Sequence, residues 1–140
     1  MPENNICVIT GCNSGIGKHT AIELAKSGYE IVMLVRDSEK SRKACEEIKK
    51  ESGSELVQLF FVDLTSMESI RRSAADLEKK FSKVDILINN AGILKRKEEV
   101  SPEGVEMTIA VNYLAPFYLT NLLLPLLEKA ESARIINVSS

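Results

Sequence analysis

The sequence predicts an α/β fold, a doubly wound parallel sheet with helices on both faces. Five short β-rich runs alternate with four runs of helical periodicity. A glycine-rich joint, T-G-C-N-S-G-I-G from Thr10 to Gly17, connects the first strand to the first helix. Polar or charged residues follow each strand, which places them all on one edge of the sheet. With right-handed crossovers, these observations predict the strand order 3-2-1-4-5.

The first half of the chain predicts three strands and two helices. Residues 6–9 form a short buried strand, and helical spacing begins at Ile16. Residues 30–35 form the second strand, after Gly28 at a helix end. Residues 38–52 form an amphipathic helix closed by Gly53, and residues 56–62 form the third strand.

The second half predicts two further helices and two further strands. Thr65 opens a capping box with Glu68, and helical spacing continues to Phe81. Residues 84–88 form the fourth strand, which ends at N-N-A-G, and residues 95–104 form a loop. A long apolar helix over residues 107–127 follows, and residues 134–138 form the fifth strand.

The glycine-rich joint favours a bound phosphate. A tight turn there leaves the free N–H groups at the helix start available, and these groups attract an anion. The alternative is a tight turn without a ligand. The loop lacks the Lys-Ser or Lys-Thr pair of a nucleoside triphosphatase loop, which excludes that class.

Composition limits the other functions. The 140 residues carry a net charge of −2, with 44% hydrophobic and 27% charged residues, as expected for one globular domain. No basic patch predicts a nucleic-acid partner, and three cysteines with one histidine predict no metal site. The cysteine pattern favours a cytoplasmic protein, and the polar start of the chain predicts no signal peptide.

The uncharged residues 107–127 are long enough to span a membrane. Their asparagines and prolines, and the flanking Glu106 and Glu128, argue against a span. We instead expect a helix covered by the sheet on one side and by a second copy of the protein on the other, which predicts a homo-oligomer.

Two charged residues at strand ends indicate a cofactor. Arg36 follows the second strand, where an arginine accommodates the 2′-phosphate of NADP and an acid would bind the ribose of NAD. Arg36 could instead be a surface arginine paired with Asp37 or Glu39. Asp63 follows the third strand and could accept a hydrogen bond from an adenine amine, or could simply start a turn.

Five motifs in order give the chain a resemblance to the short-chain dehydrogenase/reductase family across all 140 residues. They are T-G-C-N-S-G-I-G, D-L at Asp63, N-N-A-G at Asn89, V-N at Val111 and I-N-V-S-S at Ile136. The phrases L-V-R-D and V-N-Y-L-A-P-F-Y-L-T look most like retinol-dehydrogenase-like members. The resemblance implies a Rossmann-type fold that here lacks the last two strands of the family.

The resemblance implies NADP(H) as cofactor and a small carbonyl or alcohol as substrate. It assigns roles by position. Cofactor binding is implied for Gly11, Ser14, Gly15, Ile16, Gly17, Arg36, Asp63, Leu64, Asn90, Ala91 and Gly92. Asn112 matches the family asparagine that helps to hold a proton-relay water, and Ser140 matches the serine that binds the reacting substrate oxygen.

The family's catalytic Tyr-x-x-x-Lys does not occur in these 140 residues. Four residues after Tyr29, Tyr113 and Tyr118 stand Met33, Phe117 and Leu122, so none has the required lysine. We therefore expect an NADP(H)-dependent oxidoreductase represented by its cofactor-binding half, truncated relative to the family and inactive alone. The alternatives are a non-catalytic NADP-binding or interaction module and, more remotely, a methyltransferase, against which Val35 argues.

Overall fold

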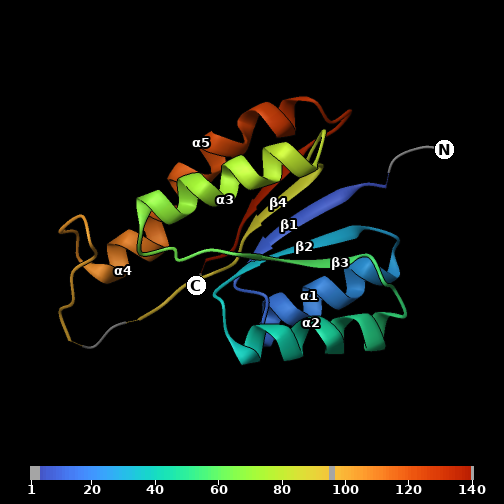
Figure 1. The fold of residues 1–140 in the computed structure, drawn as a ribbon, viewed down its shortest axis with the longest axis horizontal. Helices are drawn as coiled ribbons and strands as arrows, with labels where there is room; N and C mark the ends of the chain where they lie inside the picture. The colour runs from blue at the N-terminus through green and yellow to red at the C-terminus, as the bar shows by residue number, and fades with distance from the viewer. Residues whose placement is uncertain (1–3, 95–96, 140) are drawn as a thin grey trace.

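The computed structural model describes residues 4–94 and 97–139 and shows a five-stranded parallel sheet in the order β3-β2-β1-β4-β5 (Figure 1). This confirms the predicted fold class and strand order. The strands are β1 Ile6–Thr10, β2 Glu30–Val35, β3 Val57–Phe61, β4 Ile86–Asn89 and β5 Arg134–Asn137. The helices are α1 Gly15–Lys26, α2 Glu39–Ser52, α3 Met67–Lys80, α4 Met107–Ile109, the π-helical segment η1 Ala110–Leu114 and α5 Ala115–Glu128.

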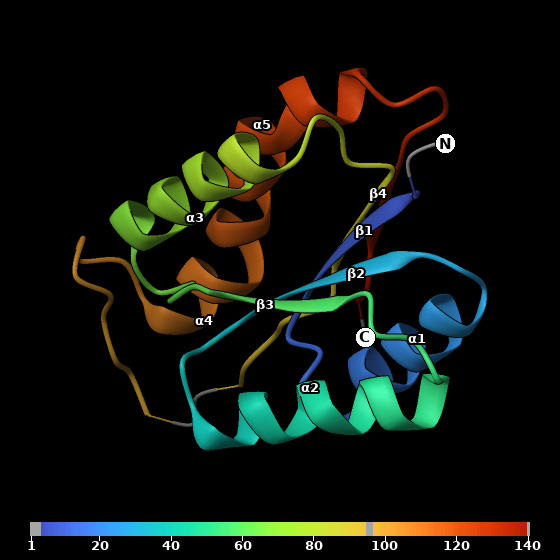
Figure 2. The same ribbon diagram turned by 45° about the vertical axis from the view of Figure 1, so that its right-hand side comes forward.

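The helices form a layer on each face of the sheet (Figures 1 and 2). Alternate residues of β1 supply the two cores, as the period of a strand requires. Ile6 and Val8 pack with α3 and α5, whereas Cys7 and Ile9 pack with α1 and α2. Because β1, β2 and β4 are buried on both faces, their sequences are continuous apolar runs.

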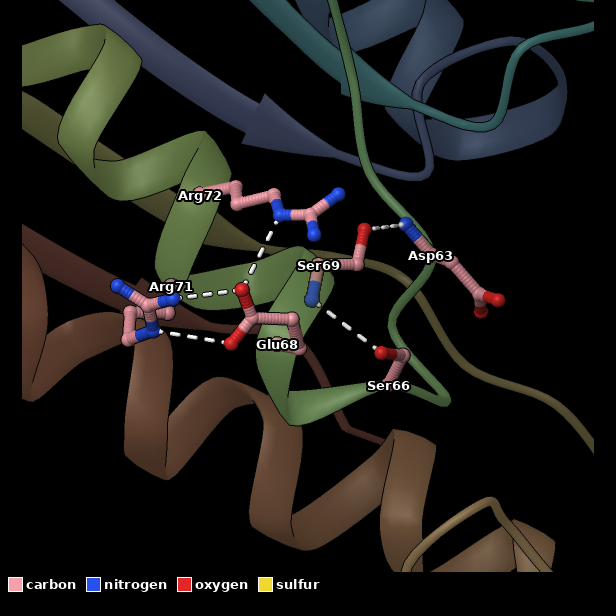
Figure 3. A network of polar contacts seen from close by, with 6 residues as sticks. All are labelled: Asp63, Ser66, Glu68, Ser69, Arg71 and Arg72. Carbon is pink, nitrogen blue, oxygen red and sulfur yellow. Dashed lines mark hydrogen bonds and ion pairs between the residues drawn. The ribbon is translucent and has the colours of Figure 1, made fainter.

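The predicted capping box at Thr65 is wrong by one residue. Ser66 is the N-cap of α3, and its hydroxyl accepts a hydrogen bond from the Ser69 amide at 3.2 Å. Thr65 is engaged elsewhere, because its amide and hydroxyl both donate to the Asp63 carboxylate. Glu68 does not complete the box but pairs with Arg71 and Arg72 (Figure 3).

The long apolar helix exists, but a π-helical segment interrupts it between α4 and α5. Pro116 has no N–H to donate to the Asn112 carbonyl four residues earlier, which favours a local change of hydrogen-bond register. One side of α5 lies in the core through Leu119, Leu123 and Leu126.

The other side of α5 is exposed to solvent, where Phe117 is 64% exposed. Tyr113, in the preceding segment η1, is 65% exposed. Among the described residues, Met107–Glu128 is the one helical stretch long and apolar enough to cross a membrane by length and composition. A third of its most apolar window is buried inside this domain.

Candidate cofactor site

The candidate site is a cavity of about 630 Å³ at the carboxyl ends of the strands. The segments that follow β1, β2, β3 and β4 all contribute to its wall, together with the start of the long helix. The lining residues are Gly11, Asn13, Ser14, Leu34, Val35, Arg36, Lys40, Val62, Asp63, Leu64, Thr65, Asn90, Ala91, Gly92, Ile93, Met107 and Val111. The volume is in the range of a small-molecule or cofactor pocket.

Eight of the eleven residues predicted for cofactor binding line this cavity: Gly11, Ser14, Arg36, Asp63, Leu64, Asn90, Ala91 and Gly92. Gly15, Ile16 and Gly17 do not. Ile16 is 73% exposed on the first turn of α1. Most of the residues predicted to bind the cofactor therefore lie together in the wall of this cavity, at the carboxyl edge of the sheet.

Two glycines allow the loop after β1 to approach the loop after β4. Gly11 has φ +63°, and a Cβ there would lie 2.7 Å from the Ala91 Cα. A Cβ on Gly17 would clash with the side-chain amide nitrogen of Asn90 and would lie 2.9 Å from the Gly11 carbonyl oxygen. Gly17 thus serves the close packing of α1 against these loops and does not form part of the cavity wall.

Hydrogen bonds hold the same two loops together. The buried Thr10 hydroxyl accepts from the backbone amides of Asn90 and Ala91, both at 3.0 Å. The Asn90 side chain donates to the Gly11 carbonyl at 3.0 Å. These contacts fix the spacing between the glycine-rich loop and the N-N-A-G segment, and with it the width of the cavity.

The start of α1 has free hydrogen-bond donors. Ser14 is the N-cap of α1, yet its side chain makes no capping hydrogen bond. Ser38 and Ser66, by contrast, cap α2 and α3 with their hydroxyl oxygens. An uncapped N-terminus of a 12-residue helix beside a cavity suits a phosphate, because both the free N–H groups and the helix dipole favour an anion.

Asp63 is held by the start of α3 (Figure 3). Its backbone amide donates to the Ser69 hydroxyl at 2.8 Å, and its carboxylate accepts from the Thr65 amide at 2.9 Å. The side chain remains exposed at the cavity wall, next to Leu64. It both starts a turn and presents a carboxylate to the cavity, so the two interpretations of Asp63 are compatible.

Asn112 lies in η1 and is paired with the backbone of Ile93. Its side-chain oxygen accepts from the Ile93 amide at 2.8 Å, and its amide donates to the Ile93 carbonyl at 2.7 Å. These bonds tie the long helix to the segment after β4. The proton-relay role of Asn112 stays a prediction, and Ser140 lies outside the described residues.

Two cations follow β2, one directly after the strand and one in the first turn of α2. Arg36 and Lys40 both line the cavity, and neither forms an ion pair with another residue in 4–94 or 97–139. Asp37 does not line the cavity and pairs with Arg42, whose guanidinium lies 5.4 Å from the centre of the Phe61 ring. The structure therefore does not pair Arg36 with Asp37 or Glu39.

The buried thiols near the site are unreactive. Burial raises the pKa of Cys12, in the glycine-rich loop, to about 12, and also raises the pKa of Cys7 to about 12. Both are therefore neutral thiols at physiological pH and poor nucleophiles. Within the described ranges, no three His, Cys, Asp or Glu side chains lie together as a metal site would require.

Sequence reasoning missed several residues of the site. Thr10 was recognised only as part of a motif, although its hydroxyl holds two backbone amides. Lys40 was not singled out, although it follows Arg36 by four residues and lines the same cavity. Asn13 gave no signal of its own, since polar residues next to glycine are common in turns, and Thr65 was predicted only as a helix cap.

Together, the fold and the site define a doubly wound α/β domain whose carboxyl edge has free donors and cations suited to an anion, the arrangement typical of dinucleotide-binding domains. A family model described as short chain dehydrogenase matches residues 5–140. The chain belongs to the short-chain dehydrogenase family.

The relatives agree with this assignment. Human retinol dehydrogenase 13 is 44% identical over 133 residues, which cover 95% of this chain and 40% of the relative. Human retinol dehydrogenase 11 is 40% identical over 135 residues, covering 96% of this chain and 42% of the relative. The resemblance to retinol dehydrogenases is thus confirmed, and the chain spans about 40% of the length of these curated relatives.

Solved structures show the same fold. A short-chain dehydrogenase of Escherichia coli CFT073, determined as a complex with NADPH, is 30% identical and has a TM-score of 0.83. The match covers 99% of this chain and 59% of that chain.

Proposed function

We propose that this chain is the cofactor-binding part of an NADP(H)-dependent oxidoreductase that acts on a small carbonyl or alcohol. The observation that carries the proposal is the cavity wall itself, which combines an uncapped helix start with Arg36 and Lys40. The NADPH complex of the similar E. coli protein supports the choice of cofactor. The names of the similar retinol dehydrogenases support a primary alcohol or aldehyde as the candidate substrate.

The residues fit such a cofactor by their chemistry. The loop from Gly11 to Gly17 and the start of α1 would hold the pyrophosphate, and Arg36 the 2′-phosphate. Asp63 and Leu64 would bind the adenine, and the segment from Asn90 to Gly92 would lie along the adenosine ribose. When bound, the nicotinamide gives or takes a hydride. Ser140 would hold the reacting substrate oxygen, and Asn112 would position a relay water through its place in η1.

The cofactor assignment is tested by Arg36→Asp in the full-length protein. Replacing the guanidinium with a carboxylate should weaken NADPH binding by about 1.5 to 3 kcal/mol, the scale of hydrogen bonds to a charged group. NADH binding should change far less, because NADH lacks the 2′-phosphate. Titration calorimetry measures both. Equal affinity of the unaltered protein for NADH and NADPH would refute the assignment.

We also propose that the 140-residue chain has no measurable turnover by itself. None of Tyr29, Tyr113 and Tyr118 has a lysine four residues later, and loss of a general acid/base costs a factor of about 100 to 10,000. A longer chain that includes the family's Tyr-x-x-x-Lys should reduce carbonyls with NADPH, and Ser140→Ala in it should lower turnover far more than cofactor affinity. Turnover by the isolated chain that survives Ser140→Ala would contradict this. NADPH binding without turnover by the full-length protein would favour a binding module.

The long helix is proposed as a contact between two copies of the protein. Tyr113 and Phe117 present apolar surface one turn apart, and exposed apolar patches favour association. Light scattering on the full-length protein tests this, and a monomer at high concentration would exclude it.

We propose a reducing, cytoplasmic location, supported by three buried cysteines that are all unpaired. Fractionation of cells that express the full-length protein tests this location.

A further inference from the structure

The chain between β4 and α4 folds into a compact turn over residues 99–107, called the 99–107 turn below. Val100 and Glu106 form an antiparallel bridge across it. Inside the turn, the Ser101 amide donates to the Val105 carbonyl at 2.6 Å, and the Val105 amide donates to the Ser101 hydroxyl at 3.2 Å. Ser101 is buried, with 6% of its surface exposed. The turn therefore has a defined shape of its own.

One side chain of this turn reaches the start of α3. The Glu103 carboxylate accepts a hydrogen bond at 2.5 Å from the amide of Met67, which lies 36 residues earlier. Met67 is the first residue of α3, and a helix start leaves that amide without an intrahelical acceptor. The N-cap Ser66 serves a different amide, that of Ser69. The helix dipole also favours a negative charge at this end of α3. Glu103 thus joins the 99–107 turn to α3, beside which it lies in Figure 2.

This contact lies behind the wall of the cofactor cavity. Leu64 and Thr65 line the cavity, and they also line a second, water-sized void of about 20 Å³. Met67 and Glu103 line the same void but not the cavity. The segment of Leu64 and Thr65 is therefore a thin partition between the cofactor cavity and the 99–107 turn.

We propose that Glu103 is a positioning residue for the adenine part of the cofactor, acting through the start of α3 on Leu64; this rests on the proposed function. Met67 stands three residues after Leu64, so its position sets where the partition lies. Asp63 is held from the same helix, because its amide donates to the Ser69 hydroxyl. The contact of Glu103 orders the partition before the cofactor arrives, which lowers the cost of binding. By linkage, a bound cofactor stabilises this contact by the same factor.

The test compares Glu103→Ala with Glu103→Gln and Glu98→Ala in the full-length protein, by calorimetry. Glu103→Ala should raise the Kd for NADPH and the Kd for NADH alike, about fivefold, the scale of one helix-capping contact. Both cofactors contain the adenine, so the pattern differs from that of Arg36→Asp. Glu103→Gln keeps an oxygen for the Met67 amide and should retain most of the affinity. Glu98→Ala removes an exposed acid that lines neither the cavity nor the void, and should change neither Kd.

Hydrogen exchange provides a readout that does not depend on turnover. Saturating NADPH should slow the exchange of the Met67 amide about fivefold in the unaltered protein, because the bound cofactor stabilises the contact with Glu103. In Glu103→Ala this slowing should be lost. The Arg134 amide donates to the Asp85 carbonyl at 2.9 Å, at the other end of the sheet, and is the internal control. Its exchange should respond to NADPH equally in the two proteins.

The outcomes separate this inference from the cofactor assignment. Unchanged Kd values for both cofactors in Glu103→Ala, together with a large loss for NADPH in Arg36→Asp, would overturn the role of Glu103 and leave the proposed function intact. This holds even if Glu103→Ala lowers the free energy of unfolding, because Glu103 would then stabilise only the fold. A loss confined to NADPH would also overturn it, since the adenine is common to both cofactors. An unaltered protein that binds neither cofactor would overturn both proposals.

Discussion

At both the amino and the carboxyl end of the sheet, a side-chain oxygen accepts hydrogen bonds from backbone amides, but the surroundings of the two contacts differ. At each end, a polar side chain ties β1 to β4 through backbone amides. At the carboxyl end, the Thr10 hydroxyl accepts from the amides of Asn90 and Ala91. At the amino end, the Asp85 carboxylate accepts from the Ile6 amide at 2.7 Å.

The surroundings of these two ties differ. Asp85 is only 7% exposed and is paired with Lys83 at 3.0 Å, so the charges of the amino end are satisfied internally. At the carboxyl end, Arg36 and Lys40 face a cavity without an ion pair in the described parts of the chain, and the start of α1 is uncapped. Polar groups satisfied within the protein stabilise the fold, whereas unsatisfied groups beside a cavity indicate a ligand.

The largest expected effect comes from breaking the tie at the amino end. Asp85→Ala removes the acceptor of the Ile6 amide and leaves Lys83 as an unpaired, largely buried cation. The free energy of unfolding should fall by about 3 kcal/mol, the scale for breaking a buried ion pair. Urea denaturation of the full-length protein measures this.

The same variant tests the division between the two ends. The affinity of its folded form for NADPH should stay unchanged, because Asp85 lies at the end of the sheet away from the cavity. Asp76→Ala, at an exposed position on α3, is the control for the loss of one acid. A loss of NADPH affinity as large as the loss of stability would show that the two ends are not independent.

A change at Thr10 should affect both properties. Thr10→Val keeps the shape of the buried side chain but leaves the amides of Asn90 and Ala91 without their acceptor. We expect a loss of about 2 kcal/mol in unfolding free energy, the cost of unsatisfied buried donors, and weaker NADPH binding as the two loops separate. Thr10→Ser retains the oxygen and should lose much less of either. Equal losses in both variants would point to methyl packing as the cause.

The fold could be predicted because its signals are local and repeated. Buried parallel strands require continuous apolar runs, and these appear at residues 6–9, 31–35 and 86–88, inside the predicted strands 6–9, 30–35 and 84–88 and within a few residues of the observed bounds. The π-helical segment was not predicted, because hydrophobic periodicity does not distinguish it from an α-helix over one turn. Pro116 was the available clue, since its missing N–H disrupts the register.

The site could be predicted only in part. The glycines and the residues directly after each strand could be recognised from their position relative to the predicted strands, and most of them line the cavity. Lys40 did not stand out, because a lysine in a charged amphipathic helix has no pattern that separates it from solvent-exposed lysines. Asp85 was likewise missed, since it falls inside the predicted strand 84–88, whose apolar pattern gives a single acid no role of its own. Both acquire their meaning from contacts between segments far apart in the chain.

The smallest expected effect concerns Asp37, which is paired with Arg42 and does not line the cavity. Arg42 pairs with Asp37, and both side chains are roughly half exposed. Arg42→Gln frees the Asp37 carboxylate to compete with the 2′-phosphate for the adjacent Arg36. We expect about a threefold loss in NADPH affinity, in the range of an exposed ion pair, and no loss for NADH. The double variant with Asp37→Asn should recover NADPH affinity in calorimetry, because it removes the competing charge. Failure of that recovery would mean that Arg42 acts by holding α2 in place against Phe61. The ion pair between Arg42 and Asp37 would then not be what keeps the Asp37 carboxylate away from Arg36.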